Sequence, residues 1–208
     1  MLSPALTRNL RKFYIFSILA SFVLFYEIDK VFMQLRGLSV TQIVTVEIVY
    51  AGLVLLLEVP LGALSDRWSR KYVLALNVGF FMLFTLLWVL ADGPSLFVLG
   101  AMAASVHTAL QSGTDTSFLF DTLKQEGQEV YFERYWGRTL VFSNAFGIVG
   151  AISGAMLVAA FGLEMPFWLT LIFSAAAVIV ASRWGNRAFI APAKNWAIGS
   201  ISLPRRAS

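Results

Sequence analysis

The chain has 208 residues, of which 58% are hydrophobic and 13% are charged, and it carries a formal net charge of +4 and no cysteine. Soluble domains contain about 25% charged residues, so the composition excludes an ordinary soluble domain and predicts an all-α integral membrane protein. The absence of cysteine excludes disulfides, zinc–thiolate sites and thiol catalysis.

The first apolar run follows Arg8, Arg11 and Lys12, an arrangement that also begins secretory signal peptides. No small-residue cleavage site closes this run and further apolar runs follow it, so we predict a retained first helix. Each run is long enough to cross a hydrocarbon core of about 30 Å as a helix, although the last is marginal. The six predicted spans are residues 13–35, 42–64, 72–91, 95–120, 139–163 and 166–182.

Lysine and arginine are unevenly distributed between the two sides of these spans. All of them except Lys30 and Arg36 fall on one side. By the positive-inside rule this side is cytoplasmic, which predicts a cytoplasmic N-terminus at residues 1–12 and a basic cytoplasmic tail at residues 183–208. We therefore expect a multi-pass protein of the cell membrane, with both termini cytoplasmic, a lipid bilayer around residues 13–182 and no nucleic-acid partner.

The connection between the fourth and fifth spans, residues 121–138, is longer than the others. Its residues 130–136 mix aromatic and charged side chains at the inner face of the membrane. Such a segment suits the membrane interface. We predict an interfacial helix here, and the alternative is a plain linker.

A short charged turn joins the second and third predicted spans. Gly62 has no Cβ, so its helix can approach a neighbour closely. Asp66 suits a cap or a helix N-terminus. Arg67, Arg70 and Lys71 are predicted to hold the turn in the cytoplasm and to pair with carboxylates on other helices.

This turn resembles the loop between helices two and three of the major facilitator superfamily of secondary transporters. The matching residues are Gly62, Leu64, Ser65, Asp66, Arg67, Arg70 and Lys71. Ser69 stands where the family usually has glycine. Shorter similarities lie at residues 35–43, 58–62, 112–116 and 120–123, so that the resemblance extends over about residues 13–182.

The resemblance implies a bundle of six transmembrane helices built as two inverted three-helix repeats, half of the family's fold. It also implies a gate at the charged turn, with an ion pair between Arg70 and Asp121 at the end of helix four. The family's transporters have twelve helices in two halves. This chain resembles the first half, so we expect a truncated product, pairing with a second six-helix half or another copy of itself, or a different way of working. Truncation is favoured over a working half-transporter.

Polar residues within the first span are candidates for binding substrate or protons, because intramembrane charges are costly and rarely idle. Glu27, Lys30 and Gln34 are spaced to share one helical face. Glu27 and Lys30 either serve transport or form a structural ion pair near the outer interface. In the second span, Glu47 is predicted to be solvated or to line an outer vestibule, and Glu58 to serve packing or gating.

The fourth span carries a more compact group. Thr108, Gln111 and Asp115 are spaced to align on one helical face. Asp115 is a candidate protonation site, and the alternative is a carboxylate paired with arginine or shielded by threonine hydroxyls. His107, the only histidine, is interpreted as hydrogen-bonded packing. Asn144 in the fifth span is a further substrate candidate.

The fifth span also has glycines in close-packing register, at Gly150 and Gly154. They loosely resemble the glycine-rich helix five of the family's antiporters, which suggests export, but we interpret them as packing residues.

Enzyme chemistry is not predicted, because the sequence has no phosphate-binding loop, metal-ligand spacing or nucleophile–base pair. No cofactor is expected. The sequence therefore predicts a secondary active transporter of a small solute that works by alternating access, with proton-coupled efflux as one form of it. The alternative is a truncated or assembly-partner membrane protein without transport activity of its own.

Overall fold

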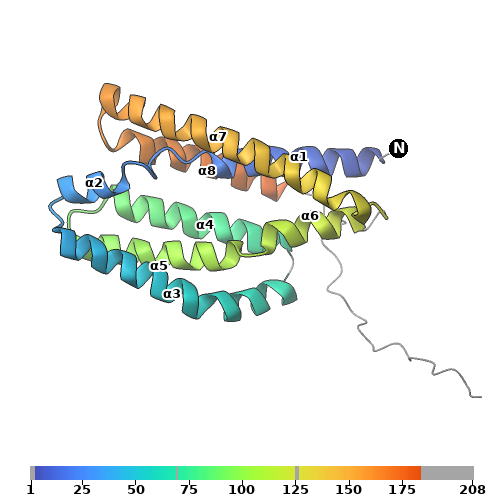
Figure 1. Ribbon diagram of the computed structural model, residues 1–208, viewed down its shortest axis with the longest axis horizontal. Helices are drawn as coiled ribbons and strands as arrows, with labels where there is room; N and C mark the ends of the chain where they lie inside the picture. The colour runs from blue at the N-terminus through green and yellow to red at the C-terminus, as the bar shows by residue number, and fades with distance from the viewer. Residues whose placement is uncertain (1–2, 69, 125–126, 184–208) are drawn as a thin grey trace, which may run out of the picture.

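A computed structural model describes residues 3–68, 70–124 and 127–183, without the side chains of residues 5, 66, 67, 70 and 71. Over this part the fold is entirely helical (Figure 1). The helices are α1 (Pro4–Ser21), α2 (Asp29–Leu35), α3 (Val40–Arg67), α4 (Arg70–Val89), α5 (Pro94–Gln111), α6 (Thr114–Lys124), the short 3₁₀ helix η1 (Glu129–Tyr131), α7 (Phe132–Phe161) and α8 (Met165–Ser182).

Local sequence explains where several helices begin. Ser3 accepts a hydrogen bond from the Leu6 backbone N–H and caps α1. Ser39 and Gln42 form a reciprocal capping box at the start of α3. Pro94 opens α5, where its missing N–H leaves no helical hydrogen bond unmade.

The predicted helical fold class is confirmed, and five segments have the length and apolar composition of membrane spans. They are Val40–Ser65, Tyr72–Val89, Pro94–Lys124, Glu129–Phe161 and Met165–Ser182. The chain is therefore compatible with a multi-pass membrane protein. The predicted first span, residues 13–35, is not among these segments.

The prediction of one continuous helix over residues 13–35 was wrong. The helix α1 begins at Pro4 and ends at Ser21, residues 22–28 are not helical, and α2 follows as a separate helix of 7 residues. We call residues 22–28 the first interruption. Its backbone is buried at Val23 and Leu24, so its polar groups must be satisfied by the surrounding helices.

Three neighbouring helices hold the first interruption in place. On α8, Thr170 accepts a hydrogen bond of 3.1 Å from the Leu24 backbone N–H. The ring of Phe25 stacks on that of Phe167, also on α8, with centroids 4.3 Å apart, and its edge meets Phe84 on α4. On α7 the predicted packing glycines lie against the interruption, since a Cβ on Gly150 would be 2.9 Å from the Val23 carbonyl oxygen.

Replacing Thr170 by valine removes the acceptor for the Leu24 N–H without changing the side-chain volume much. The buried donor is then unsatisfied, so we expect the free energy of unfolding to fall by about 1–2 kcal/mol. The matched control is Thr85→Val, because Thr85 is equally buried but donates only to the Phe81 carbonyl of its own helix. Thermal unfolding in detergent checks the pair, and equal losses in both variants would contradict the assignment.

The fourth predicted span, residues 95–120, is also not one continuous helix. It divides into α5 and α6 at Ser112 and Gly113, and Gly113 has φ +75°, a conformation that glycine adopts without strain. We call these two residues the second interruption. The hydroxyl of Thr114 donates a hydrogen bond of 2.5 Å to the Leu110 carbonyl oxygen, so that this carbonyl group is satisfied across the second interruption.

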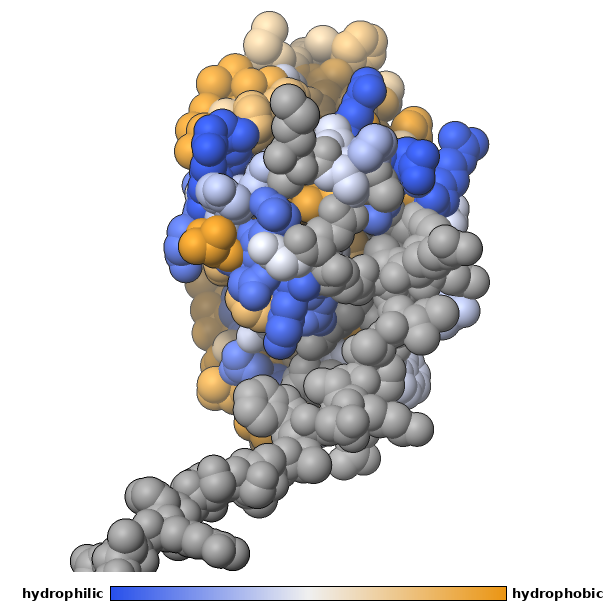
Figure 2. Space-filling view, turned by 90° about the vertical axis from the view of Figure 1, so that its right-hand side faces the viewer, coloured by the Kyte–Doolittle hydropathy of each residue, from blue (hydrophilic) through white to orange (hydrophobic). Residues whose placement is uncertain are grey.

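The helices pack in the spatial order α3, α5, α4, α8, α1, α7 (Figure 1). At one end α1 begins, α6 and α8 end and α7 begins, and Lys12 donates a hydrogen bond of 2.7 Å to the Arg183 carbonyl. We call this the basic end, and the opposite end, which holds α2, the Arg36 end. Figure 2 views the basic end, where hydrophilic residues gather in front of apolar flanks.

The predicted interfacial helix at residues 130–136 is not a separate helix, and its place at a membrane interface stays a prediction. The helix α7 already begins at Phe132, so this segment is η1 followed by the first turn of α7. Phe132, Tyr135 and Trp136 pack against the core of the basic end, whereas Val130 is 81% exposed. The aromatic residues are therefore partly used for helix packing.

Candidate functional site

A cavity of about 880 Å³ lies between α1, α4 and α7 and is bordered by both interruptions. Its aromatic lining is Phe16, Tyr26, Phe81 and Trp136. Its polar lining includes Ser17, Ser21, Glu27, Asn77, His107, Gln111, Asp115, Thr116, Thr139, Ser143, Asn144 and Ser174. We call it the central cavity. Four predicted substrate or proton candidates, Glu27, Gln111, Asp115 and Asn144, are thus brought together on its wall.

The two carboxylates of the central cavity lie at different interruptions, Glu27 within the first and Asp115 just after the second. Glu27 lies in the turn just before α2, and Asp115 lies in the first turn of α6, where a negative charge suits the helix N-terminus. The Gln111 side chain hydrogen-bonds Asp115. Among the described residues neither carboxylate has an ion-pair partner. The predicted pairing of Glu27 with Lys30 was therefore wrong.

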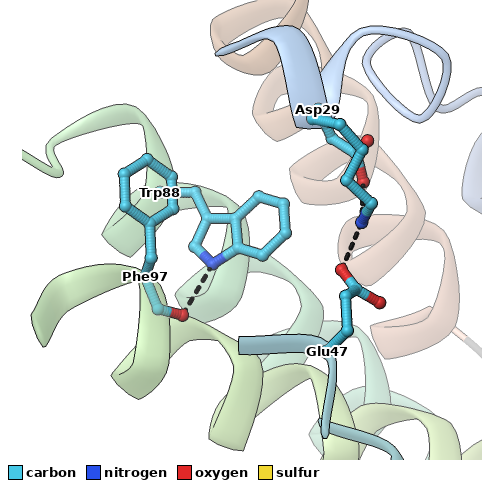
Figure 3. Close-up of polar contacts among 5 residues, drawn as sticks. Asp29, Glu47, Trp88 and Phe97 are labelled. Carbon is cyan, nitrogen blue, oxygen red and sulfur yellow. Dashed lines mark hydrogen bonds and ion pairs between the residues drawn. The ribbon is translucent and has the colours of Figure 1, made fainter. Parts of the chain in front are cut away.

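Lys30 instead belongs to a smaller cavity of about 160 Å³, which we call the outer cavity. There its ammonium contacts Glu47 on α3 and lies 3.1 Å from a carboxylate oxygen of Asp29 (Figure 3). The pair that the helical register suggested fails because the first interruption rotates Glu27 away from the face of α2. Glu47 lines this cavity, and the prediction that it faces the outer side of a membrane stays a prediction. Gln34 is exposed and lines neither cavity.

Of the three residues predicted to align, Gln111 and Asp115 line the central cavity together and are hydrogen-bonded across the second interruption, whereas Thr108 lines the outer cavity. The Thr108 hydroxyl lies 3.0 Å from that of Tyr50 on α3. On the same wall, Trp88 donates a hydrogen bond of 3.1 Å to the Phe97 carbonyl, which fixes its ring (Figure 3).

Two side chains line both cavities and therefore separate them: Tyr26 from the first interruption and His107 from α5. His107 Nδ1 lies 3.1 Å from the backbone carbonyl oxygen of Asn77. In return, the side-chain amide of Asn77 donates a hydrogen bond of 2.7 Å to the backbone carbonyl oxygen of His107. His107 is thus hydrogen-bonded between α4 and α5, as the packing interpretation predicts.

Sequence reasoning missed Arg36, which joins three loops at the Arg36 end. Its guanidinium lies 3.1 Å from Asp92 in the α4–α5 loop and 2.5 Å from Glu164 in the α7–α8 loop. It also donates a hydrogen bond of 3.3 Å to the Val89 carbonyl oxygen, and its central carbon lies 5.0 Å from the centroid of the Phe32 ring. The available signal was its rarity, because Arg36 and Lys30 are the basic residues on that side of the predicted spans.

The charged turn between α3 and α4 is described only in part. The side chains of Asp66, Arg67, Arg70 and Lys71 lie outside the described residues, so the predicted pairing of Arg70 with the half-buried Asp121 stays a prediction.

Gly62 does not make the predicted close approach, because a Cβ built on it would meet nothing within 4 Å among the described residues. Glu58 accepts a hydrogen bond of 3.0 Å from the Ser112 hydroxyl and so ties α3 to the second interruption. A packing role for Glu58 is consistent with that contact.

Over the described residues, no group of three or more histidine, aspartate or glutamate side chains is placed to hold a metal ion. The central cavity presents carboxylates, amides, hydroxyls, the His107 imidazole and aromatic rings. A scan against protein-family models and a search of curated proteins both find no match for this sequence.

Proposed function

We propose that this chain is a secondary carrier, or the substrate-binding part of one, that moves a small solute through the central cavity by alternating access. The observation that carries the proposal is that two interrupted helices each contribute a carboxylate, Glu27 and Asp115, to one cavity. Interrupted helices at the interface of repeats, with polar groups at membrane depth, are typical of transporter binding sites.

The arrangement of the helices supports an origin from two inverted repeats. Both α1 and α5 have 18 residues before an interruption, and they begin at opposite ends of the bundle. The three-helix unit α1–α2, α3 and α4 corresponds in chain order to the unit α5–α6, α7 and α8. If each helix in the packing order α3, α5, α4, α8, α1, α7 is replaced by its counterpart, the result is the same order read backwards. This is the relation expected of two three-helix repeats about a two-fold axis in the membrane plane. In this proposal α1, the first interruption and α2 together make the first crossing.

The sequence at Gly62, Asp66, Arg67, Arg70 and Lys71, which resembles a loop of the major facilitator superfamily, also supports the proposal. Counted with this first crossing, the proposed six crossings and the basic end favour a cytoplasmic location of both termini. Proton coupling through Asp115 or Glu27 is part of the proposal, because a carboxylate at membrane depth is costly and is rarely without a function.

A flux measurement tests the carrier proposal. The purified chain is reconstituted into vesicles that contain a pH-sensitive dye, and cationic, neutral and anionic solutes are added in turn. We expect proton movement that depends on a solute and exceeds that of empty vesicles. Asp115→Asn is expected to lower it at least 10-fold without affecting insertion, whereas Glu133→Gln, which changes an exposed carboxylate outside both cavities, leaves it unchanged.

The alternative is an assembly partner that moves nothing by itself. It is favoured by α3 and α7, on which large apolar side chains such as Leu55, Val59 and Met156 are at least 69% exposed. If no solute class gives flux above empty vesicles while the chain is folded and inserted, the carrier proposal fails for this chain and the assembly role takes its place.

A further inference from the structure

The geometry points to organic cations as the ligand class of the central cavity. This inference rests on the proposed function, because it names the solute that the proposed carrier takes. It is drawn from the charge, the aromatic lining and the size of the cavity.

The charge of the lining is one-sided. Glu27 and Asp115 are its acidic groups, and none of the described lining residues is lysine or arginine. The nearby ammonium of Lys30 lines the outer cavity and already contacts two carboxylates there. Opposite charges attract more strongly in a low-dielectric interior than in water, so a cation gains on entering the central cavity, whereas an anion meets two like charges.

His107 does not change this sign. Its Nδ1 faces the Asn77 carbonyl oxygen at 3.1 Å, so that nitrogen carries the hydrogen that the bond requires. In the neutral ring the other nitrogen is then an acceptor. The remaining polar groups, such as Gln111 and Asn144, are uncharged and can orient a ligand without selecting an anion.

The aromatic residues supply the second feature. Phe16, Phe81 and Trp136 line the same cavity from α1, α4 and α7, and Tyr26 lies where the central cavity meets the outer one. Ring faces attract cations, including those without hydrogen-bond donors. A volume of about 880 Å³ falls in the range of sites for drug-sized ligands, roughly 300–1,000 Å³, and exceeds what a single inorganic ion needs.

A pair of probes with the same shape and opposite charge tests the inference. Tetraphenylphosphonium is bound to the full chain in lipid nanodiscs, empty discs give the background, and tetraphenylborate is the anionic counterpart. The fluorescence of Trp136 reports occupancy when Trp136→Phe is measured alongside. We expect saturable binding of the phosphonium only, weakened at least 5-fold by Glu27→Gln and by Asp115→Asn, and unchanged by Glu133→Gln.

Two results would overturn the inference: equal phosphonium affinity in the wild type and in both cavity variants, or protein-dependent binding of the borate that matches or exceeds that of the phosphonium. The test separates this inference from the carrier proposal. If neutral or anionic solutes are transported but the phosphonium does not bind, the carrier proposal stands and the inference of a cation site fails. If the phosphonium binds in a way that depends on Glu27 and Asp115 but no solute is transported, the cation site stands and the carrier proposal fails.

Discussion

Replacing Gly154 by alanine is expected to destabilise the protein, although alanine ordinarily favours a helix over glycine. A Cβ at this position of α7 would lie 2.9 Å from the Leu24 carbonyl carbon and closer still to its oxygen. The clash is with backbone, which cannot rotate away as a side chain can. We expect a loss of about 1–3 kcal/mol of stability, typical of overpacking, together with displacement of the first interruption from α7.

Two other glycines of α7 make this a graded series. At Gly150 the added Cβ would lie 2.9 Å from the Val23 carbonyl oxygen, and at Gly147 it would lie 3.9 Å from that of Ser21, an ordinary contact. Thermal unfolding in detergent should therefore rank the alanine variants, with position 154 the least stable, then 150, then 147, which should equal or exceed the wild type. A wild-type melting temperature for Gly154→Ala would show that α7 does not hold the interruption.

If the chain is a carrier that works by alternating access, as proposed above, replacing Arg36 by glutamine is expected to open the Arg36 end of the bundle. Each of its ion pairs has an exposed partner, since Asp92 is 91% and Glu164 is 57% exposed in its side chain. Exposed pairs contribute up to about 1 kcal/mol each. Losing both should shift the balance between closed and open forms by about 1–2 kcal/mol, which corresponds to about 5- to 30-fold.

The lack of cysteine in the chain makes this shift measurable, because one introduced thiol is then the sole reporter. Ala104→Cys places it on the wall of the outer cavity. We expect Arg36→Gln to raise its labelling by a membrane-impermeant maleimide about 5- to 30-fold, with partial rescue by Arg36→Lys. Arg134→Gln, at the basic end, is the control and should have no effect. An unchanged labelling rate in Arg36→Gln would mean that Arg36 does not keep this end closed.

The sequence by itself determined the all-helical fold class and the positions of three of the six predicted helices. The composition favours apolar surroundings, and the spans at residues 42–64, 72–91 and 166–182 correspond to α3, α4 and α8. Helix signals of this kind are local: apolar length, caps and prolines act within a few residues. Four of the six substrate or proton candidates line the central cavity. The signal for them was that charged and amide groups are rare in apolar runs.

The tertiary structure alone decided where the first helix is interrupted. Residues 22–28 contain no glycine or proline, so nothing local predicts a break. The break is stabilised by three neighbouring helices. Glycines of α7 leave room for its carbonyl groups, Thr170 of α8 accepts a hydrogen bond from its Leu24 N–H, and the Phe25 ring packs against rings of α4 and α8.

The same break reassigned the charges. Glu27 lines the central cavity with Asp115. Lys30 instead forms ion pairs with Asp29 and Glu47, and Arg36 forms ion pairs with carboxylates of two loops that are distant in the chain. Ion pairing depends on distance in space, and the distances between segments far apart in the chain are set by packing, which a single sequence does not reveal.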